Sequence, residues 1–207
     1  MCGRYYFDDE TMNDMKQLVD FIDESLKNKK INGDIYPSEM APVITAGQYP
    51  ARLAAGLMSW GFLSENLSED ASLQKNTARR LINARAETAF DKITFKDSMR
   101  RRRCVIPAGH YYEWDKSKNK VSFYTDNGQS IYMAGFYRKY GERWNFMIVT
   151  TKANASVEKF HNRMPLILKK EEIIPWIYDT ESAGGLLKKV PGAIRPVIPY
   201  EQQSILL

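Results

Sequence analysis

The second residue of this 207-residue chain is a cysteine, Cys2. If Met1 is removed, one residue then carries both an α-amine and a thiol. The amine can form a Schiff base with an aldehyde, and the thiol can then add to the imine carbon and close a five-membered thiazolidine ring. With ordinary pKa values of about 7.7–8.0 for the amine and about 8.5 for the thiol, a minority of each group is reactive at neutral pH. The alternative is that Cys2 has no chemical role.

Three other side chains could serve such a reaction. Sugar opening and imine formation both move protons, and the carboxyl of Glu113 can transfer them if burial raises its pKa. The amide of Asn83 can hydrogen-bond an amine without keeping it protonated, as a carboxylate would. His161 titrates near neutral pH and suits the later steps. Taken singly, a Glu before Trp or an isolated Asn is more often structural, as we expect for His110.

Basic residues could provide a surface for nucleic acid, since neutralising phosphates releases counterions. The net charge is +5, and arginines gather at Arg79-Arg80, at Arg85 and in the run 100–103. A solvated charged face is the alternative, and the run 100–103 is expected to end a helix, where cations are favoured anyway. Trp114 could stack on a base or could fill the core.

The elements that position these residues are predicted to form an α+β domain. After Asp8-Asp9, apolar residues recur at helical spacing: Met12, Met15, Leu18, Val19, Ile22 and Leu26. Strands are expected at 53–60, 121–125, 131–135, 144–151 and 194–198, and short helices at 171–178 and 181–189. The Asn-Gly pair in 126–128 favours a tight hairpin turn between two of these strands. Because strands outnumber helices without a βαβ rhythm, we predict a mainly antiparallel sheet in one domain, 1–207.

Composition narrows the class of protein further. The start of the chain lacks a signal peptide, and no stretch reaches the ~20 apolar residues that span a bilayer, so we expect a cytoplasmic protein without a membrane partner. Cys2 and Cys104 are expected to be free thiols, because a reducing cytosol disfavours a disulfide and no CxxC spacing suggests zinc. The polar segment 64–75 is predicted to be an exposed loop.

Five blocks of the sequence resemble, in order, the motifs of the SOS-response-associated peptidase (SRAP) family. They are Met1-Cys2-Gly3-Arg4-Tyr5; Trp60-Gly61; Asn83-Ala84-Arg85-Ala86-Glu87-Thr88; Arg102-Arg103-Cys104-Val105-Ile106-Pro107-Ala108 leading to Tyr112-Glu113-Trp114; and His161-Asn162-Arg163-Met164-Pro165. Each block alone is a weak signal, but five in order are specific. One departure is Gly109-His110-Tyr111, where the family usually has Gly-Phe.

The resemblance implies a single-domain fold in which a twisted, barrel-like sheet with flanking helices carries a positively charged groove. It also implies that the protein removes its own Met1 and crosslinks Cys2 to abasic sites in single-stranded DNA, shielding them during the response to DNA damage. The implied partner is single-stranded DNA containing abasic sites. No cofactor is implied, and we expect a monomer.

Matched residue by residue, the resemblance gives each candidate a role. Cys2 matches the nucleophile, Asn83 the residue that holds the amino terminus, Glu113 the acid/base and His161 the remaining catalytic position. The residues that match DNA contacts are Arg4, Arg85, Trp114, Thr150 and Arg163.

Two other functions stay open at the level of the sequence. One is a thiol peptidase acting on other peptides, with Cys2 as nucleophile and His161 as base. The other is a non-catalytic reader of modified or single-stranded DNA, for which Cys2 would be dispensable.

Overall fold

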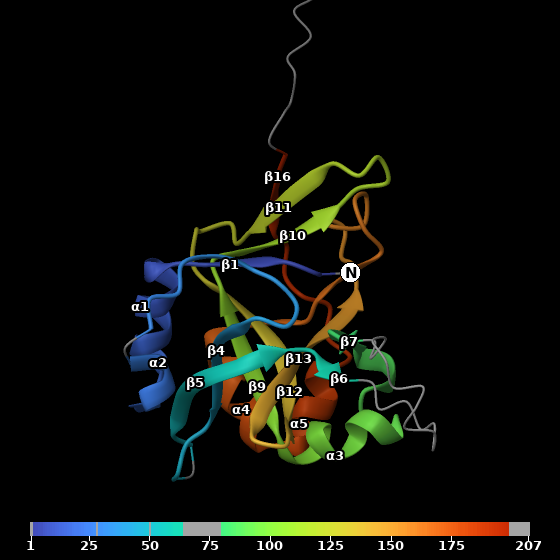
Figure 1. Ribbon diagram of the computed structural model, residues 1–207. Coiled ribbons are helices and arrows are strands. Elements are labelled where there is room, and N and C mark those ends of the chain that lie inside the picture. Colours follow the sequence, from blue (N-terminus) through green and yellow to red (C-terminus); the bar gives the residue numbers. More distant parts are fainter. Residues whose placement is uncertain (1, 28, 50, 64–79, 199–207) are drawn as a thin grey trace, which may run out of the picture.

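Figure 1 shows the computed structural model, in which a smaller sheet lies above a larger barrel-like sheet. The structure describes residues 2–27, 29–49, 51–63 and 80–198. The predicted loop at 64–75 and the residue Arg79 lie outside the described residues.

The larger sheet closes on itself. Its five barrel strands follow the order β13-β12-β9-β4-β5, and their bounds are β4 (Met40–Ala46), β5 (Leu53–Trp60), β9 (Arg103–Ala108), β12 (Ile131–Tyr140) and β13 (Arg143–Lys152). Parallel pairing of Asn145 with Ser59 and of Phe146 with Trp60 joins β13 to β5 and completes the ring. The short strands β2 (Phe21–Ile22), β8 (Asn83–Arg85), β14 (Arg163–Pro165) and β15 (Ile167–Leu168) extend it. The α+β, barrel-like prediction is confirmed.

The smaller sheet is antiparallel throughout. Its order is β16-β11-β10-β1-β3, with bounds β1 (Tyr5–Phe7), β3 (Gly33–Ile35), β10 (His110–Trp114), β11 (Lys120–Tyr124) and β16 (Arg195–Val197). β6 (Phe62–Leu63) pairs with β7 (Arg80–Leu81). β10, at the centre of this sheet, carries two of the predicted site residues, Glu113 and Trp114.

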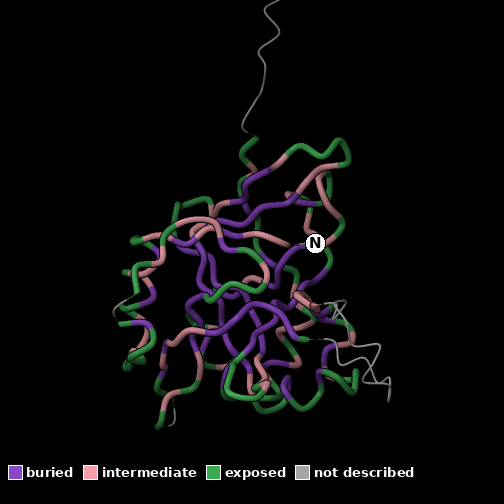
Figure 2. Tube along the Cα trace, in the orientation of Figure 1, coloured by how far each residue is buried: buried purple, intermediate pink, exposed green. Residues whose placement is uncertain are grey.

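Alternate residues of the barrel strands enter two separate clusters of buried side chains. Cys104 and Ile106 of β9 pack with Tyr5 and Phe123 of the smaller sheet. Val105, between them, belongs to the cluster that the helices cover. Both faces of these strands are therefore buried, as the continuous buried stretches in Figure 2 show. Cys2 belongs to the cluster under the smaller sheet.

The helices are short and lie around the barrel. They are α1 (Asp9–Leu18), α2 (Glu24–Lys27), α3 (Ile93–Arg101), α4 (Ile173–Tyr178) and α5 (Thr180–Leu186), with 3-10 turns η2 (Ala86–Thr88) and η3 (Lys170–Glu172). Within the described residues, every helix is too short or too polar to span a lipid bilayer.

The predicted N-terminal helix begins where expected but ends early. Asp8 caps it by accepting a 2.8 Å hydrogen bond from the Thr11 amide. The helix ends at Leu18, and the chain then forms β2, so the extension of the apolar pattern to Leu26 was wrong. The amides of residues 20 and 23 donate instead to β5 carbonyls, which satisfies them at the sheet edge.

The predicted hairpin around the Asn-Gly pair is only half right. Both strands form and Gly128 adopts φ +73° in the turn between them. However, β11 pairs with β10 and β16, whereas β12 pairs with β9, β13 and β15. The turn therefore passes the chain from one sheet to the other. The strand at 53–60 is confirmed without change, and those at 144–151 and 194–198 and the two short helices are confirmed with small shifts of their ends.

The arginine run 100–103 ends α3, as predicted, and three of its four side chains are held by contacts within the protein. Arg103 is 3% exposed, and its guanidinium donates to groups of the interior: the carbonyls of Met99, Arg100, Trp176 and Ile177 and the Thr180 hydroxyl. Arg101 and Arg102 form ion pairs with Asp97. In Figure 1, α3 lies at the bottom of the view, far from the N-terminal end of the chain.

Candidate active site around Cys2

Cys2 is fully buried and has a free thiol, and Cys104 is also buried and free. The Cys2 Sγ donates a weak hydrogen bond to the Arg4 carbonyl at 3.7 Å. Burial raises the pKa of the Cys2 thiol well above its usual range, and the negative charge of Glu113 raises it further. At neutral pH the buried sulfur is therefore a protonated thiol, and it has no contact with solvent.

Asn83 holds the backbone of Cys2. Its Nδ2 donates a 2.8 Å hydrogen bond to the Cys2 carbonyl oxygen. β8 places Asn83 by pairing in parallel with β13, with Asn83 opposite Ile148. In the described part of the chain, the buried Oδ1 of Asn83 has no hydrogen-bond partner, so its acceptor capacity faces the site unused.

Glu113 is a carboxyl in the interior, only 2% exposed. Burial raises its pKa to about 7, because the low-polarity surroundings disfavour its charged form. Since its charge acts on the Cys2 thiol, the two groups belong to one site. A carboxyl with a pKa of about 7 exists in both protonation states near neutral pH, which is the property a proton-transfer group needs.

His161 lies in the turn before β14. Its Nδ1 contacts the backbone of Arg163, at 3.0 Å from the amide nitrogen and 3.1 Å from the carbonyl oxygen. Burial lowers the pKa of His161, so the neutral imidazole dominates. Thr150 of β13 pairs with Arg85 of β8 on one side and with Pro165 of β14 on the other. The segments that carry Asn83 and His161 therefore flank the same end of β13.

Arg163 is fixed by an ion pair. Its guanidinium donates to both carboxylate oxygens of Glu87, at 2.5 and 2.9 Å, and to the Thr150 carbonyl at 2.6 Å. Thr150 is itself fully buried, and its hydroxyl donates to the Ala84 carbonyl at 3.3 Å. Thr150, which the resemblance matches to a DNA contact, therefore has no exposed surface here, and its carbonyl accepts from Arg163.

Arg4 is enclosed by aromatic rings. Its guanidinium lies 4.8 Å from the Tyr36 ring centre, 5.4 Å from Tyr112 and 5.1 Å from Trp114. It also donates to Asp34 at 3.1 Å. Trp114 is half-buried and lies outside both clusters of buried residues, so it does not fill the core. Cation–π contacts of this kind hold a guanidinium in one place.

Asp34 is the residue of this group that the sequence analysis missed. It also accepts a 2.7 Å hydrogen bond from the Tyr112 hydroxyl, which in turn contacts His110 Nε2 at 2.8 Å. His110 is stacked between Tyr6 and Tyr124, which confirms its structural role. The position of Asp34 in the sequence does not indicate a role at this site, because the pairing of β1 with β3 is what brings it beside Arg4.

The structure thus brings Cys2 together with Asn83, through a hydrogen bond, and with Glu113, through its charge; Arg4 lies two residues after Cys2, just before β1. Arg85 is exposed at the end of β8. Among the described residues, no group of His, Cys, Asp and Glu side chains is placed to hold a metal ion.

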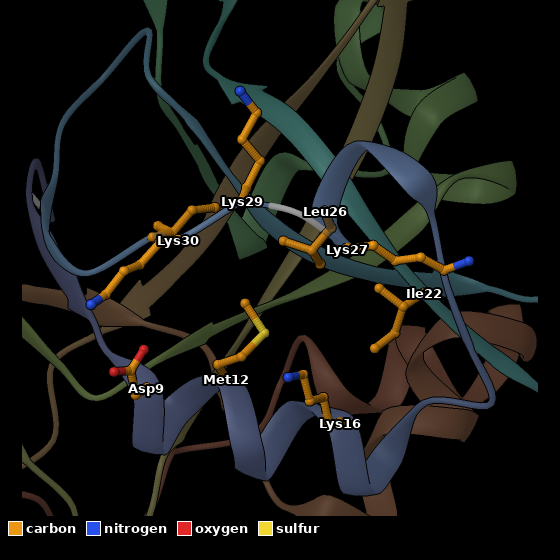
Figure 3. Close-up of a pocket in the computed structure, with 9 residues that line it drawn as sticks. Asp9, Met12, Lys16, Ile22, Leu26, Lys27, Lys29 and Lys30 are labelled. Carbon is orange, nitrogen blue, oxygen red and sulfur yellow. The ribbon is translucent and has the colours of Figure 1, made fainter.

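A separate pocket of about 550 Å³ lies between α1 and α2 on the other side of the molecule. Its apolar lining includes Met12, Ile22 and Leu26, and Figure 3 shows four lysines around it. Their ammonium groups point in different directions, and Lys27 pairs with Glu24. This pocket therefore does not present convergent polar groups as the surroundings of Cys2 do.

Comparison with known proteins agrees with the motifs. The family model described as SOS response associated peptidase (SRAP) matches residues 1–198. The abasic site processing protein YoqW of Bacillus subtilis is 29% identical over 194 residues, which cover 86% of this chain and 80% of YoqW. The abasic site processing protein YedK of Escherichia coli is 34% identical over 104 residues, 47% of each chain.

Solved structures share the fold. A crystal structure of a Bacteroides thetaiotaomicron protein superposes with a TM-score of 0.76 at 20% identity, covering 97% of this chain and 93% of that one. A Bordetella bronchiseptica protein gives a TM-score of 0.73 at 21% identity, covering 95% and 99%. At these identities the likeness supports the fold alone.

Proposed function

Because the chain belongs to the SOS response associated peptidase (SRAP) family, we propose that it crosslinks covalently to abasic sites in single-stranded DNA. The α-amine and thiol of Cys2, exposed when the protein removes its own Met1, react with the aldehyde of the ring-opened sugar and form a thiazolidine. The crosslink shields the abasic site during the response to DNA damage.

One observation carries this proposal: a residue able to form a thiazolidine lies beside a buried carboxyl whose pKa is about 7. The 2.8 Å bond from Asn83 fixes the Cys2 backbone, and therefore the position of the amine that reacts. Glu113 can protonate the sugar ring oxygen as the ring opens and can accept a proton as the imine forms. We assign the remaining proton transfers to His161, whose pKa is lowered by burial and by the charge of the amino terminus.

The charged side chains around this centre suit a DNA backbone. Arg85 is exposed and can meet a phosphate directly, whereas Arg4 and Arg163 must give up part of their pairing with Asp34 and Glu87 to do so. Trp114 offers a half-exposed ring to a base next to the abasic nucleotide. We infer that the protein acts on DNA in the cytoplasm, as a monomer.

The burial of the Cys2 thiol bears on the alternative of a peptidase acting on other proteins. A sulfur with no exposed surface does not accept an extended peptide without a large rearrangement. An abasic nucleotide lacks a base and therefore needs less room than an extended peptide. Peptidase activity is then confined to the chain's own Met1.

The deciding experiment is intact mass after incubation of the processed protein with a single-stranded oligonucleotide carrying one abasic site. The expected result is one adduct per protein, absent for Cys2→Ala and absent with an unmodified strand. Binding without any adduct, by correctly processed protein, would favour the non-catalytic reader instead.

A further inference from the structure

Two buried hydroxyl groups near Cys2 have no hydrogen-bond partner within the described residues. They belong to Tyr5 and Tyr111, whose side chains are both fully buried. A buried polar group without a partner destabilises the fold, so it needs an explanation such as a catalytic role. The hydroxyl of Tyr132 is unpartnered as well, but it lies in the cluster under the helices, away from Cys2.

Strand pairing places both hydroxyls in the same part of the site. Tyr5 of β1 lies directly opposite Tyr111 of β10, so the two side chains are on one face of the smaller sheet. Glu113 is two residues beyond Tyr111 on the same strand and therefore on the same face. Cys2, Tyr5 and Tyr111 belong to one cluster of buried residues.

The charges of Cys2 and Glu113 also affect the pKa values of these tyrosines. Burial raises the pKa of both tyrosines, and the charge of the Cys2 thiolate raises each of them further. The charge of Glu113 acts on Tyr111 as well. Both phenols therefore keep their O–H when the thiol ionises, and they can act as hydrogen-bond donors throughout the reaction.

The sulfur needs such donors. In the described structure it donates to the Arg4 carbonyl, an acceptor that cannot stabilise a thiolate. Burial disfavours the charged sulfur, and hydrogen bonds to the charged form oppose that effect. Resting on the function proposed above, we propose that the hydroxyls of Tyr5 and Tyr111 donate hydrogen bonds to the Cys2 sulfur as it loses its proton, and so promote ring closure.

The step balances without another reactant. The thiol proton passes to the Glu113 carboxylate. The sulfur electron pair forms the C–S bond with the carbon of the protonated imine, and the π electrons of the C=N bond move to nitrogen. The product is a neutral thiazolidine, and the tyrosines only donate hydrogen bonds.

The test uses Tyr5→Phe and Tyr111→Phe, each of which removes one oxygen atom, with Tyr132→Phe as the matched control. Loss of an unpartnered hydroxyl should leave the melting temperature of all three variants equal to or above the wild-type value. Only the first two should form the stable adduct more slowly, by roughly tenfold, the effect of one lost hydrogen bond to a charged acceptor.

Borohydride trapping separates this step from the earlier one, because borohydride reduces the imine but not the closed ring. Tyr5→Phe and Tyr111→Phe should form the imine at the wild-type rate, accumulate it in trappable form, and need a higher pH for half-maximal ring closure. Ring closure at the wild-type rate and pH in both variants would overturn the proposal.

Failure of the proposed function would look different. The wild-type protein would then give no adduct with abasic DNA, whether trapped or not. In that case, formaldehyde, which forms a thiazolidine with an N-terminal cysteine, can be used to test whether the Tyr5 and Tyr111 hydroxyls promote ring closure. Slower closure with formaldehyde in the two variants, but not in Tyr132→Phe, would support the tyrosine role, and equal rates would reject it.

Discussion

The side chain of Asn83 donates a 2.8 Å hydrogen bond to the carbonyl oxygen of Cys2, 81 positions earlier in the chain. β1 continues from Cys2 into the smaller sheet, whereas β8, which carries Asn83, is hydrogen-bonded to the barrel. This single bond therefore links the two sheets at the reacting residue. It fixes the Cys2 backbone without adding a charge to the site.

Replacing Asn83 with Ala should leave a folded protein that crosslinks at least about tenfold more slowly, because the Cys2 backbone loses its anchor. The rate is measured by gel shift with abasic single-stranded DNA. Asn145→Ala is the matched control, since buried Asn145 makes a similar 2.9 Å bond to the Gly61 carbonyl. Both changes should cost about 1–3 kcal/mol of stability. Equal slowing by both would show that Asn83 acts only through stability.

Titration of Glu113 should make the folded protein less stable as the pH rises towards 7. Its folded pKa of about 7 exceeds its ordinary value of 4.5, so the folded protein holds this proton more tightly than the unfolded chain does. The stabilisation is complete below pH 4.5 and is lost as the pH rises to about 7. The difference corresponds to roughly 3 kcal/mol, as an order of magnitude.

Glu113→Gln removes this titration. Relative to wild type, the variant should therefore gain stability as the pH rises from 4.5 to about 7. Urea unfolding across this pH range measures the effect. Glu142→Gln, at a site that is 95% exposed, should keep the wild-type dependence. A Glu113→Gln profile parallel to that of wild type would mean that the carboxyl is already charged at low pH.

Glu87 competes with DNA for Arg163 because it occupies both arms of the guanidinium. Glu87→Gln should raise the affinity for single-stranded DNA, by up to about fivefold, since a partly exposed ion pair is worth up to about 1 kcal/mol. The plot of log affinity against log salt should steepen by about 0.7, corresponding to one more phosphate contact.

Fluorescence anisotropy in a Cys2→Ala background measures this binding without crosslinking. Glu181→Gln removes the same charge at an exposed site on α5 and should leave the salt dependence unchanged. Weaker binding by Glu87→Gln would instead show that the Glu87 carboxylate helps DNA binding by positioning Arg163.

Five strands were predicted from the sequence, but β4, β9 and β10 were not, and neither was the pairing of the predicted strands. The Asn-Gly turn was recognised at 126–128, yet the actual hairpins join β10 to β11 and β12 to β13. Asp115 shapes the first of these turns by accepting hydrogen bonds from the Ser117 and Asn119 amides. A local turn signal states only that the chain bends. Which strands pair depends on how each strand buries both of its faces, and that is a property of the whole barrel.

For the site, motif order predicted the residues that we propose to react and Asn83, which holds them, but not the other residues around them. Cys2, Asn83 and Glu113 come together as the resemblance implied. Asp34 went unnoticed because its position beside Arg4 depends on pairing between distant strands. The burial of Thr150 could not be predicted either, because it depends on both faces of β13 being covered by other parts of the chain.

Arg103 belongs to a basic run, but its own side chain is buried and has a structural role. Its buried guanidinium satisfies carbonyls of α3 and α4. Arg103→Ala should therefore lower the unfolding free energy by about 3–5 kcal/mol, because several buried acceptors lose their donor at once. DNA affinity should stay within twofold, measured by anisotropy below the melting temperature of the variant. Arg101→Ala, at a side chain that is 76% exposed, should change neither quantity appreciably. A large loss of affinity in Arg101→Ala would place DNA on the α3 side of the molecule, and the surface around Cys2 would then not be the whole binding site.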